Sequence, residues 1–294
     1  MHNNHEVWLE VALNGAAGRA YQPLIPISAS EIISQGIDCA HAGASVIHLH
    51  VYDDAGQPSE NVDQYRRVIE GIKEKVDIIV YPTIALTGTA EQRYSPIEAL
   101  AKYGLLDWGV VDPGSVNITH RSQIESGEEG LLYNNPDSHI QHGLKLAERD
   151  NWRPAYAIYE PGFLRSGAAF AQTVRLADPP VYRLMFSDNL LFGCKPTIHA
   201  LDFYAQVIAD ELGNDADWMI SGLDAHIQHL IAPALAMGAH IRVGLEDAPF
   251  GTLETNVQLV EGAANLIEQS GYSIVAPEPY YNGDRGPKVC ERDR

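Results

Sequence analysis

Short apolar runs rich in β-branched residues alternate along the chain with longer stretches in which apolar residues recur every three or four positions. The first pattern favours strands and the second favours helices. Strands are expected at about 6–12, 45–51, 77–82, 108–112, 154–159, 180–186, 217–221 and 239–245. Helices are expected at about 29–42, 61–74, 95–103, 137–148, 163–175, 196–211, 225–237 and 253–269. The pattern therefore predicts repeated β/α units.

Strands that are each followed by a helix are typical of an α/β protein, and eight such units fit a (β/α)8 TIM barrel. A doubly wound sheet with extra elements is the alternative. The chain has 294 residues, without a long linker or a low-complexity segment. We therefore predict a single barrel domain over residues 1–294, with a short C-terminal extension from about residue 272. Ser28 and Glu31 form a Ser-x-x-Glu capping box, which supports a helix start at this point.

The composition excludes several classes of partner. A formal net charge of -19 argues against a nucleic-acid partner, because phosphate binding needs clustered Lys and Arg. No apolar run approaches the roughly 20 residues that a membrane helix needs, so no membrane partner is expected. The chain also lacks the G-x-G-x-x-G, Walker A and G-x-S-x-G signatures of common dinucleotide, nucleotide and hydrolase sites.

The three cysteines, Cys39, Cys194 and Cys290, are far apart and odd in number, and they form no C-x-x-C pair. The N-terminal residues contain no apolar segment of the kind found in signal peptides. Both observations favour a reduced, cytoplasmic location.

His48 and His50 are the most informative residues in the sequence. Val46, Ile47, Leu49 and Val51 surround them and favour a buried strand, in which side chains two positions apart point to the same face. Two imidazoles on one face can supply half of a metal site. Hydrogen-bonded core histidines explain a lone His-x-His equally well.

Glu246 supplies the third candidate ligand. In a TIM barrel the chemistry lies at the C-terminal ends of the strands, and His48, His50 and Glu246 fall at the ends of the second and eighth predicted strands. Both strands neighbour the first, so the side chains could meet. Two His and one Glu form a recurrent catalytic zinc set. A structural ion-pair cluster at the barrel rim is the alternative.

Asp247 and Arg242 suggest what such a metal would do. If the turn begins near Glu246, Asp247 can act as a base on a bound substrate that Arg242 orients. A neighbouring Arg lowers the pKa of an Asp by about 1 to 3 units, which weakens the base, so the metal must acidify the substrate. A Lewis acid on a keto oxygen does this by stabilising the enolate.

Thr83 and Asn14 fall at the ends of the third and first predicted strands, where they could donate hydrogen bonds to a substrate carboxylate or carbonyl. Capping and turn roles are common for both residue types, and for Asn14 such a role is the preferred interpretation. Asp112, in Asp-Pro-Gly-Ser, is interpreted as a turn residue in the same way.

Several of these segments resemble the β-keto acid cleavage enzyme family, whose founding activity is 3-keto-5-aminohexanoate cleavage. The matching stretches, which together extend over nearly the whole chain, are Asn-Gly-Ala (14–16), Pro-Leu-Ile-Pro-Ile-Ser (23–28), Ala-Gly-Ala-Ser-Val-Ile-His-Leu-His-Val (42–51), Gly-Gln-Pro-Ser (56–59), Asp-Pro-Gly-Ser-Val-Asn (112–117) and His-Ile-Arg-Val-Gly-Leu-Glu-Asp (240–247).

The resemblance implies a zinc-dependent TIM barrel that condenses a β-keto acid with acetyl-CoA and cleaves the adduct to acetoacetate and a new acyl-CoA. It implies that His48, His50 and Glu246 hold the metal. Asp247, supported by Arg242, would remove the proton, and Thr83 would contact the substrate. It also favours a homo-oligomer, for example a tetramer.

Three positions depart from the aminohexanoate enzyme. Polar residues of that enzyme are replaced here by Ala17 after the first strand, Val110 on the fourth and Ala157 on the fifth. A buried ammonium group without polar partners is costly, so the resemblance with these changes predicts an uncharged, apolar substrate side chain. A metal-dependent aldolase or isomerase without CoA, and a non-catalytic metal-binding barrel, are the alternative functions.

Overall fold

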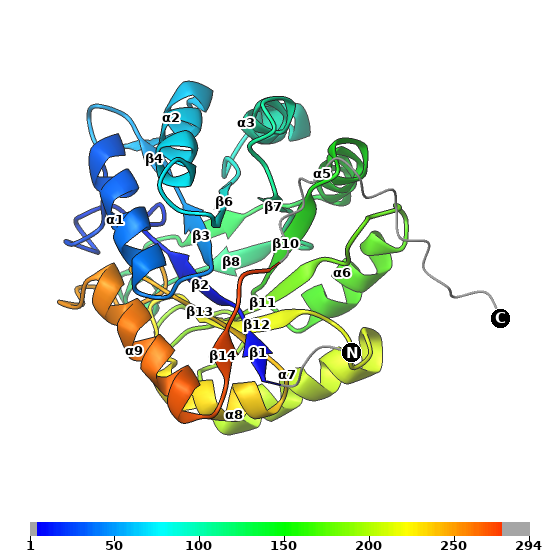
Figure 1. Ribbon diagram of the computed structural model, residues 1–294. Coiled ribbons are helices and arrows are strands. Elements are labelled where there is room, and N and C mark those ends of the chain that lie inside the picture. The colour runs from blue at the N-terminus through cyan, green and yellow to red at the C-terminus, as the bar shows by residue number, and fades with distance from the viewer. Residues whose placement is uncertain (1–4, 278–294) are drawn as a thin grey trace.

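Eight parallel strands form the centre of the computed structural model, which describes residues 5–277 (Figure 1). They follow the order β6-β3-β2-β13-β12-β11-β10-β7 around the sheet. Their bounds are β2 (Leu9–Ala12), β3 (Val46–Leu49), β6 (Ile79–Pro82), β7 (Trp108–Val110), β10 (Arg153–Ile158), β11 (Val181–Phe186), β12 (Trp218–Gly222) and β13 (His240–Val243). Strands β6 and β7 are in contact, so the sheet is nearly closed. The predicted TIM barrel is confirmed.

Helices surround the barrel (Figure 1). They are α1 (Ala29–His41), α2 (Val62–Lys73), α3 (Ala90–Lys102), α5 (Asp137–Asp150), α6 (Gly162–Ala171), α7 (Ile198–Glu211), α8 (Ile231–Ala236), which follows the 3-10 turn η1 (Gln228–Leu230), and α9 (Asn256–Gln269). The predicted helix at 95–103 begins earlier, because Thr89 and Gln92 form a capping box that opens α3 at Ala90. Within residues 5–277, no helix is long and apolar enough to cross a membrane.

The remaining elements are small. The expected strand at 6–12 is divided into β1 (Glu6–Val7) and β2, and β1 pairs with β14 (Ser273–Ile274). Strands β4 (Val51–Tyr52) and β5 (Pro58–Ser59) form one antiparallel pair. Strands β8 (Val116–Ile118) and β9 (Leu131–Tyr133) form another, with α4 (Arg121–Ser126) between them, and the sequence did not predict this hairpin. Apart from β14 and its neighbours, the predicted C-terminal extension, like Cys290, lies outside the described residues.

Aromatic and charged side chains close the N-terminal end of the barrel. The rings of Trp8 and Trp108 are 5.5 Å apart, and the guanidinium of Arg153 lies 5.3 Å from the Trp8 ring. Arg153 also pairs with Asp217, which follows α7. These contacts pack the N-terminal end of the barrel, whereas TIM barrels carry their chemistry at the C-terminal ends of the strands.

Candidate metal centre and substrate cavity

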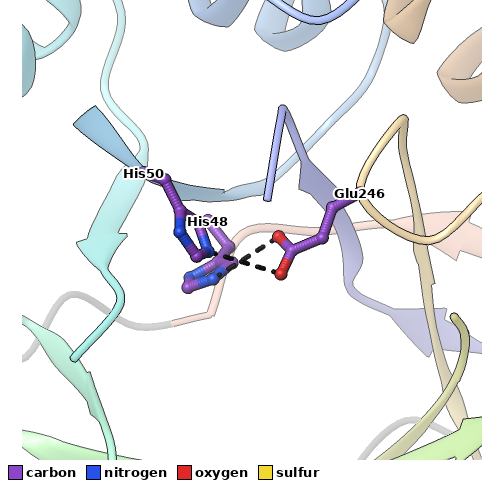
Figure 2. A group of neighbouring side chains, drawn as sticks. All are labelled: His48, His50 and Glu246. Carbon is purple, nitrogen blue, oxygen red and sulfur yellow. Dashed lines mark ion pairs between the residues drawn. The ribbon is translucent and has the colours of Figure 1, made fainter. Parts of the chain in front are cut away.

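His48, His50 and Glu246 meet at the C-terminal end of the barrel (Figure 2). The distance from His48 Nε2 to Glu246 Oε2 is 3.5 Å, and that from His50 Nε2 to Glu246 Oε1 is 3.4 Å. One candidate ligand atom from each residue lies within 4.8 Å of the others. The structure thus brings together the three side chains that strand parity and strand order selected in the sequence.

The turn after β13 explains how Glu246 and Asp247 both reach this point. It begins at Gly244, two residues earlier than the sequence suggested, and the Asp247 amide donates to the Gly244 carbonyl. Gly244 has a φ of 138°, and a Cβ there would lie 2.1 Å from the Ala12 carbonyl oxygen. Only glycine therefore fits where this turn crosses the end of β2.

Asn14 fixes the backbone of His50. Its Oδ1 accepts from the His50 amide at 2.9 Å, while its Nδ2 donates to the carbonyls of His50 and Pro26 at 3.0 and 2.9 Å. The structure therefore gives Asn14 a positioning contact, in line with the preferred interpretation from the sequence. A direct contact of Asn14 with substrate stays a prediction.

The donor set fits a divalent cation. His50 Nε2 and Glu246 Oε2 are buried without a hydrogen-bond partner. Burial lowers the pKa of His48 well below its usual value, which leaves a neutral imidazole with a free lone pair. Burial opposes ionisation of Glu246, but the nearby imidazoles and Arg242 hold its pKa well below the usual range. A neutral His48 beside an ionised Glu246 is in the protonation state that a metal binds.

The balance of charge in the barrel interior also favours a bound cation. In the ion pairs around the cluster, four carboxylates share two guanidinium groups: Glu10, Asp112, Glu246 and Asp247 against Arg183 and Arg242. Buried charge without compensation is costly. A bound dication would cancel this excess of negative charge.

Asp247 and Arg242 form a paired unit beside the cluster. Arg242 donates from Nε to Asp247 Oδ2 at 2.9 Å and from Nη2 to Oδ1 at 2.8 Å. Ser221 Oγ donates to Oδ2 at 2.8 Å, and Arg242 Nη1 donates to Glu10 at 2.9 Å. The pair alone would lower the pKa of Asp247, as expected from the sequence. Burial outweighs it and raises the pKa, which makes Asp247 a stronger base.

A cavity of about 300 Å³ opens onto the cluster. His48, His50, Glu246, Arg242 and Thr83 all line it. The three positions that depart from the aminohexanoate enzyme line the same cavity: Ala17, Val110 and Ala157. Apolar side chains make up much of the rest of its wall: Leu86, Ile118, Leu131, Met185, Leu190, Leu223, Leu245 and Phe250.

Sequence reasoning missed three buried charged residues inside the barrel, of which Asp112 and Arg183 line the cavity. Asp112, interpreted as a turn residue, is 4% exposed and accepts from Tyr133 Oη at 2.7 Å and from the Ala157 amide at 2.6 Å. Arg183 and Glu10 were not considered. Both are single charged residues within otherwise apolar strands, at positions whose parity points them into the barrel. That signal would have found them.

Comparison with known proteins agrees with the geometry. A sequence model of the beta-keto acid cleavage enzyme family matches residues 6–280. The chain belongs to this family. The resemblance seen in the sequence is thereby confirmed, and the chain is an enzyme of the beta-keto acid cleavage type.

Related proteins of the family differ in what their names say they act on. The chain is 26% identical to a 3-keto-5-aminohexanoate cleavage enzyme of Fusobacterium nucleatum, over 88% of this chain and 90% of the relative. It is 25% identical to a 3-dehydrocarnitine:acetyl-CoA trimethylamine transferase of Rhizobium meliloti, over 94% and 95%. It is 24% identical to a 3-oxoadipate:acetyl-CoA acetyltransferase of Cupriavidus necator, over 90% of each.

Solved structures support the fold of this beta-keto acid cleavage family member. ObcA in its binary complex with oxaloacetate superposes with a TM-score of 0.63 at 17% identity, over 86% of this chain and 66% of the ObcA chain. The chain thus spans about two thirds of ObcA. A phospho-2-dehydro-3-deoxyheptonate aldolase from Thermotoga maritima has a TM-score of 0.54 at 11% identity, over 92% of this chain and 72% of the aldolase. At these identities the likeness shows the fold alone.

Proposed function

We propose that the protein condenses a β-keto acid with acetyl-CoA and cleaves the adduct to acetoacetate and a new acyl-CoA. The observation that carries this proposal is the placement of the His48, His50 and Glu246 cluster with Arg242 in one cavity, where Arg242 pairs with the adjacent Asp247. The family match and the acetyl-CoA named for two of its relatives support it.

Zinc is the metal that we propose for the cluster, with His48, His50 and Glu246 as its ligands. Two imidazoles and one carboxylate form a recurrent catalytic zinc set, which leaves room for substrate. When bound, the ion supplies Lewis-acid stabilisation of the negative charge that develops on the keto oxygen.

Asp247 then removes a proton from the carbon between the keto and carboxylate groups. Arg242 and Ser221 hold both carboxylate oxygens of Asp247 in place during this step. The carbanion forms a new bond to the acetyl carbonyl carbon, and the CoA thiolate leaves that carbon and adds to the keto carbon. The bond between the keto carbon and the carbon that carries the carboxylate then breaks, which releases the new acyl-CoA. Asp247 returns the proton to that second carbon and so forms acetoacetate. Thr83 is proposed to donate to a substrate oxygen.

The substrate side chain is proposed to be uncharged. Ala17, Val110 and Ala157 line the cavity, and a cationic tail would find no acid at these positions. The names of the relatives contain an amino group, a trimethylamine and an adipate, so charge on the tail differs among them. An apolar wall favours a β-keto acid with an aliphatic tail.

Acetoacetate formation from acetyl-CoA and a panel of β-keto acids, with and without a chelator, tests this function. The panel should contain tails of matched length that are aliphatic, ammonium-bearing or carboxylate-bearing. The aliphatic members are expected to react fastest, and a chelator should stop the reaction. Absence of turnover with every member would refute the proposal.

A metal-dependent aldolase or isomerase is the second candidate, favoured by the same cluster on the same type of barrel. Such an enzyme would consume its substrate without acetyl-CoA. The acetyl-CoA requirement therefore separates the two functions. A non-catalytic metal-binding barrel is disfavoured, because the Asp247 and Arg242 pair has the contacts that a base needs.

We also propose a cytoplasmic homo-oligomer, for example a tetramer. Cys39 and Cys194 are free thiols, which supports a reducing compartment. Light scattering on the purified protein measures the mass, and a monomer at working concentrations would refute the oligomer.

A further inference from the structure

Arg183 lies across the floor of the cavity from β11 and is 3% exposed. Its Nη1 donates to Tyr81 Oη at 3.0 Å and its Nη2 to the Ala155 carbonyl at 3.2 Å. Its Nε is buried and has no hydrogen-bond partner. Buried donors are almost always satisfied, so an unpaired one beside a cavity requires an explanation.

The other two arginines on barrel strands, Arg242 and Arg153, each have an acceptor for their Nε–H. In Arg242, Nε and both terminal nitrogens donate to Asp247 and Glu10. Arg153 donates from Nε to the Pro179 carbonyl and pairs with Asp217. Among the described residues on barrel strands, only Arg183 leaves its Nε without an acceptor.

Asp112 does not satisfy all the hydrogen-bond donors of Arg183. The closest approach of their side chains, from Nη2 to Oδ1, is 3.7 Å and does not involve Nε. The Asp112 oxygens already accept from Tyr133 and from the Ala157 amide. Asp112 offsets the charge of Arg183, therefore, but it does not supply an acceptor for the Nε–H.

Arg183 is also close to the metal cluster. Tyr81 connects the two, since its hydroxyl accepts from Arg183 and its ring centroid lies 4.7 Å from that of His48. Arg183 and His48 line the same cavity, with Glu246 beside them. A substrate held at the cluster would therefore lie over the guanidinium of Arg183.

We propose that Arg183 recognises the carboxylate of the β-keto acid, by donating its Nε–H to a carboxylate oxygen. This inference rests on the proposed function, since it takes a β-keto acid as the substrate. Guanidinium groups suit carboxylates because the hydrogen bond is charge-assisted and its geometry is fixed. Arg183 thereby selects keto acids over neutral ketones or esters that could also reach the metal.

Binding of two small probes tests the assignment without turnover. Acetoacetate carries the carboxylate, whereas methyl acetoacetate keeps the keto group and replaces the carboxylate by a neutral ester. Calorimetric titration of the zinc-loaded enzyme should show tighter binding of acetoacetate. The double variant Arg183→Met with Asp112→Asn is preferable to Arg183→Met alone, because it leaves no buried carboxylate without compensation.

The double variant should bind acetoacetate at least about tenfold more weakly, because a hydrogen bond to a charged group is lost. Its affinity for methyl acetoacetate should stay within about twofold. Asp112→Asn alone is the matched control and should keep the preference for acetoacetate. Repeating the titrations on chelator-treated protein separates Arg183 from the metal, since the effect of the double variant should persist. Equal loss for both probes, or loss for neither, would overturn the proposal.

Arg183→Lys is the second variant, in case the double variant fails to fold. It keeps the charge but removes the Nε–H. The KM for the β-keto acid should rise at least about tenfold while the KM for acetyl-CoA stays unchanged, and an unchanged KM for the keto acid would refute the contact. Failure of the proposed function would appear differently, as absence of acetoacetate formation by the wild-type enzyme.

Discussion

Gly15 and Gly18 lie in the loop after β2, and both have left-handed backbone angles, with φ of 64° and 77°. A Cβ at Gly15 would lie 2.6 Å from Glu246 Cγ, whereas a Cβ at Gly18 would meet nothing within 4 Å. The pair therefore offers a controlled test of how tightly Glu246 is held, because the backbone strain of an alanine is similar at both positions.

Gly15→Ala should weaken zinc binding at least about tenfold, because the new Cβ displaces the Glu246 carboxylate from the imidazoles. Gly18→Ala should bind zinc like the wild type. Gly18→Ala should lose about 1 kcal/mol of unfolding free energy, the cost of a left-handed alanine, and Gly15→Ala should lose more, because its Cβ also meets Glu246. Competition with a chromophoric chelator measures the zinc affinity, and urea unfolding measures the stability. Equal zinc affinity in the two variants would contradict the proposed role of Glu246.

Asp247→Asn tests the proposed base. The amide keeps the size of the side chain but cannot take up a proton, so kcat should fall by about 100- to 10,000-fold. The zinc content should stay unchanged, since Asp247 pairs with Arg242 rather than with the imidazoles. Steady-state kinetics and metal analysis on the same preparation provide the two readouts. A kcat within tenfold of the wild type would assign the base to another group.

Glu31 makes the stability of the start of α1 dependent on pH. It accepts from the backbone amides of Ile27 and Ser28, and these bonds, with smaller contributions from Arg19 and the Ser28 side chain, lower its pKa from 4.5 to about 2. A carboxyl group whose pKa is lower in the folded state stabilises the fold fully when the pH is above its ordinary pKa. This stabilisation is lost as the pH falls toward the lowered pKa.

Glu31→Gln should therefore destabilise the protein at pH 7 and by progressively less below pH 4.5. Glutamine resembles the protonated carboxyl, so the two proteins converge as the wild type takes up its proton. Urea unfolding at pH 7, 4 and 3 gives the comparison, because the effect is lost between pH 4.5 and about 2. A difference in stability that is independent of pH would mean that the charge of Glu31 does not stabilise the start of α1.

The elements differ in how well the sequence predicted them, and the differences have physical causes. The eight barrel strands are mostly apolar, because both faces of each strand are buried. The β8 and β9 hairpin has mostly polar residues between its strands, so no period is visible. Tertiary contacts, among them the bond from Tyr133 to Asp112 and the backbone bonds from Arg121 to Asn189 and from Leu191 to Thr119, hold it in place, and no local pattern contains them.

At the scale of the whole molecule, the barrel made the site predictable. Knowing that the chemistry lies at strand ends was enough to connect His48 and His50 with Glu246, nearly two hundred residues away in the sequence. The interior network was not predictable. The contacts of Glu10 with Arg242 and Tyr81, and of Tyr81 with Arg183, depend on side-chain directions across the closed barrel.

Metal binding at the cluster should stabilise the whole fold, because the dication would offset the excess of buried carboxylates. A dication that binds the folded state alone and is present at 1,000 times its dissociation constant adds about 4 kcal/mol. A chelator should therefore lower the Tm of the wild type, measured by scanning calorimetry. His50→Ala should show a lower Tm that the chelator does not change further. A chelator effect of equal size in both proteins would place the metal elsewhere.

The metal content of the protein purified without added metal tests the central claim most directly. Wild-type protein should contain about one zinc ion per chain, because His48, His50 and Glu246 form one catalytic-type site with three protein ligands. His48→Ala should lose most of this zinc, whereas His199→Ala, an exposed position on α7, should keep it. Undiminished zinc in His48→Ala would contradict the account.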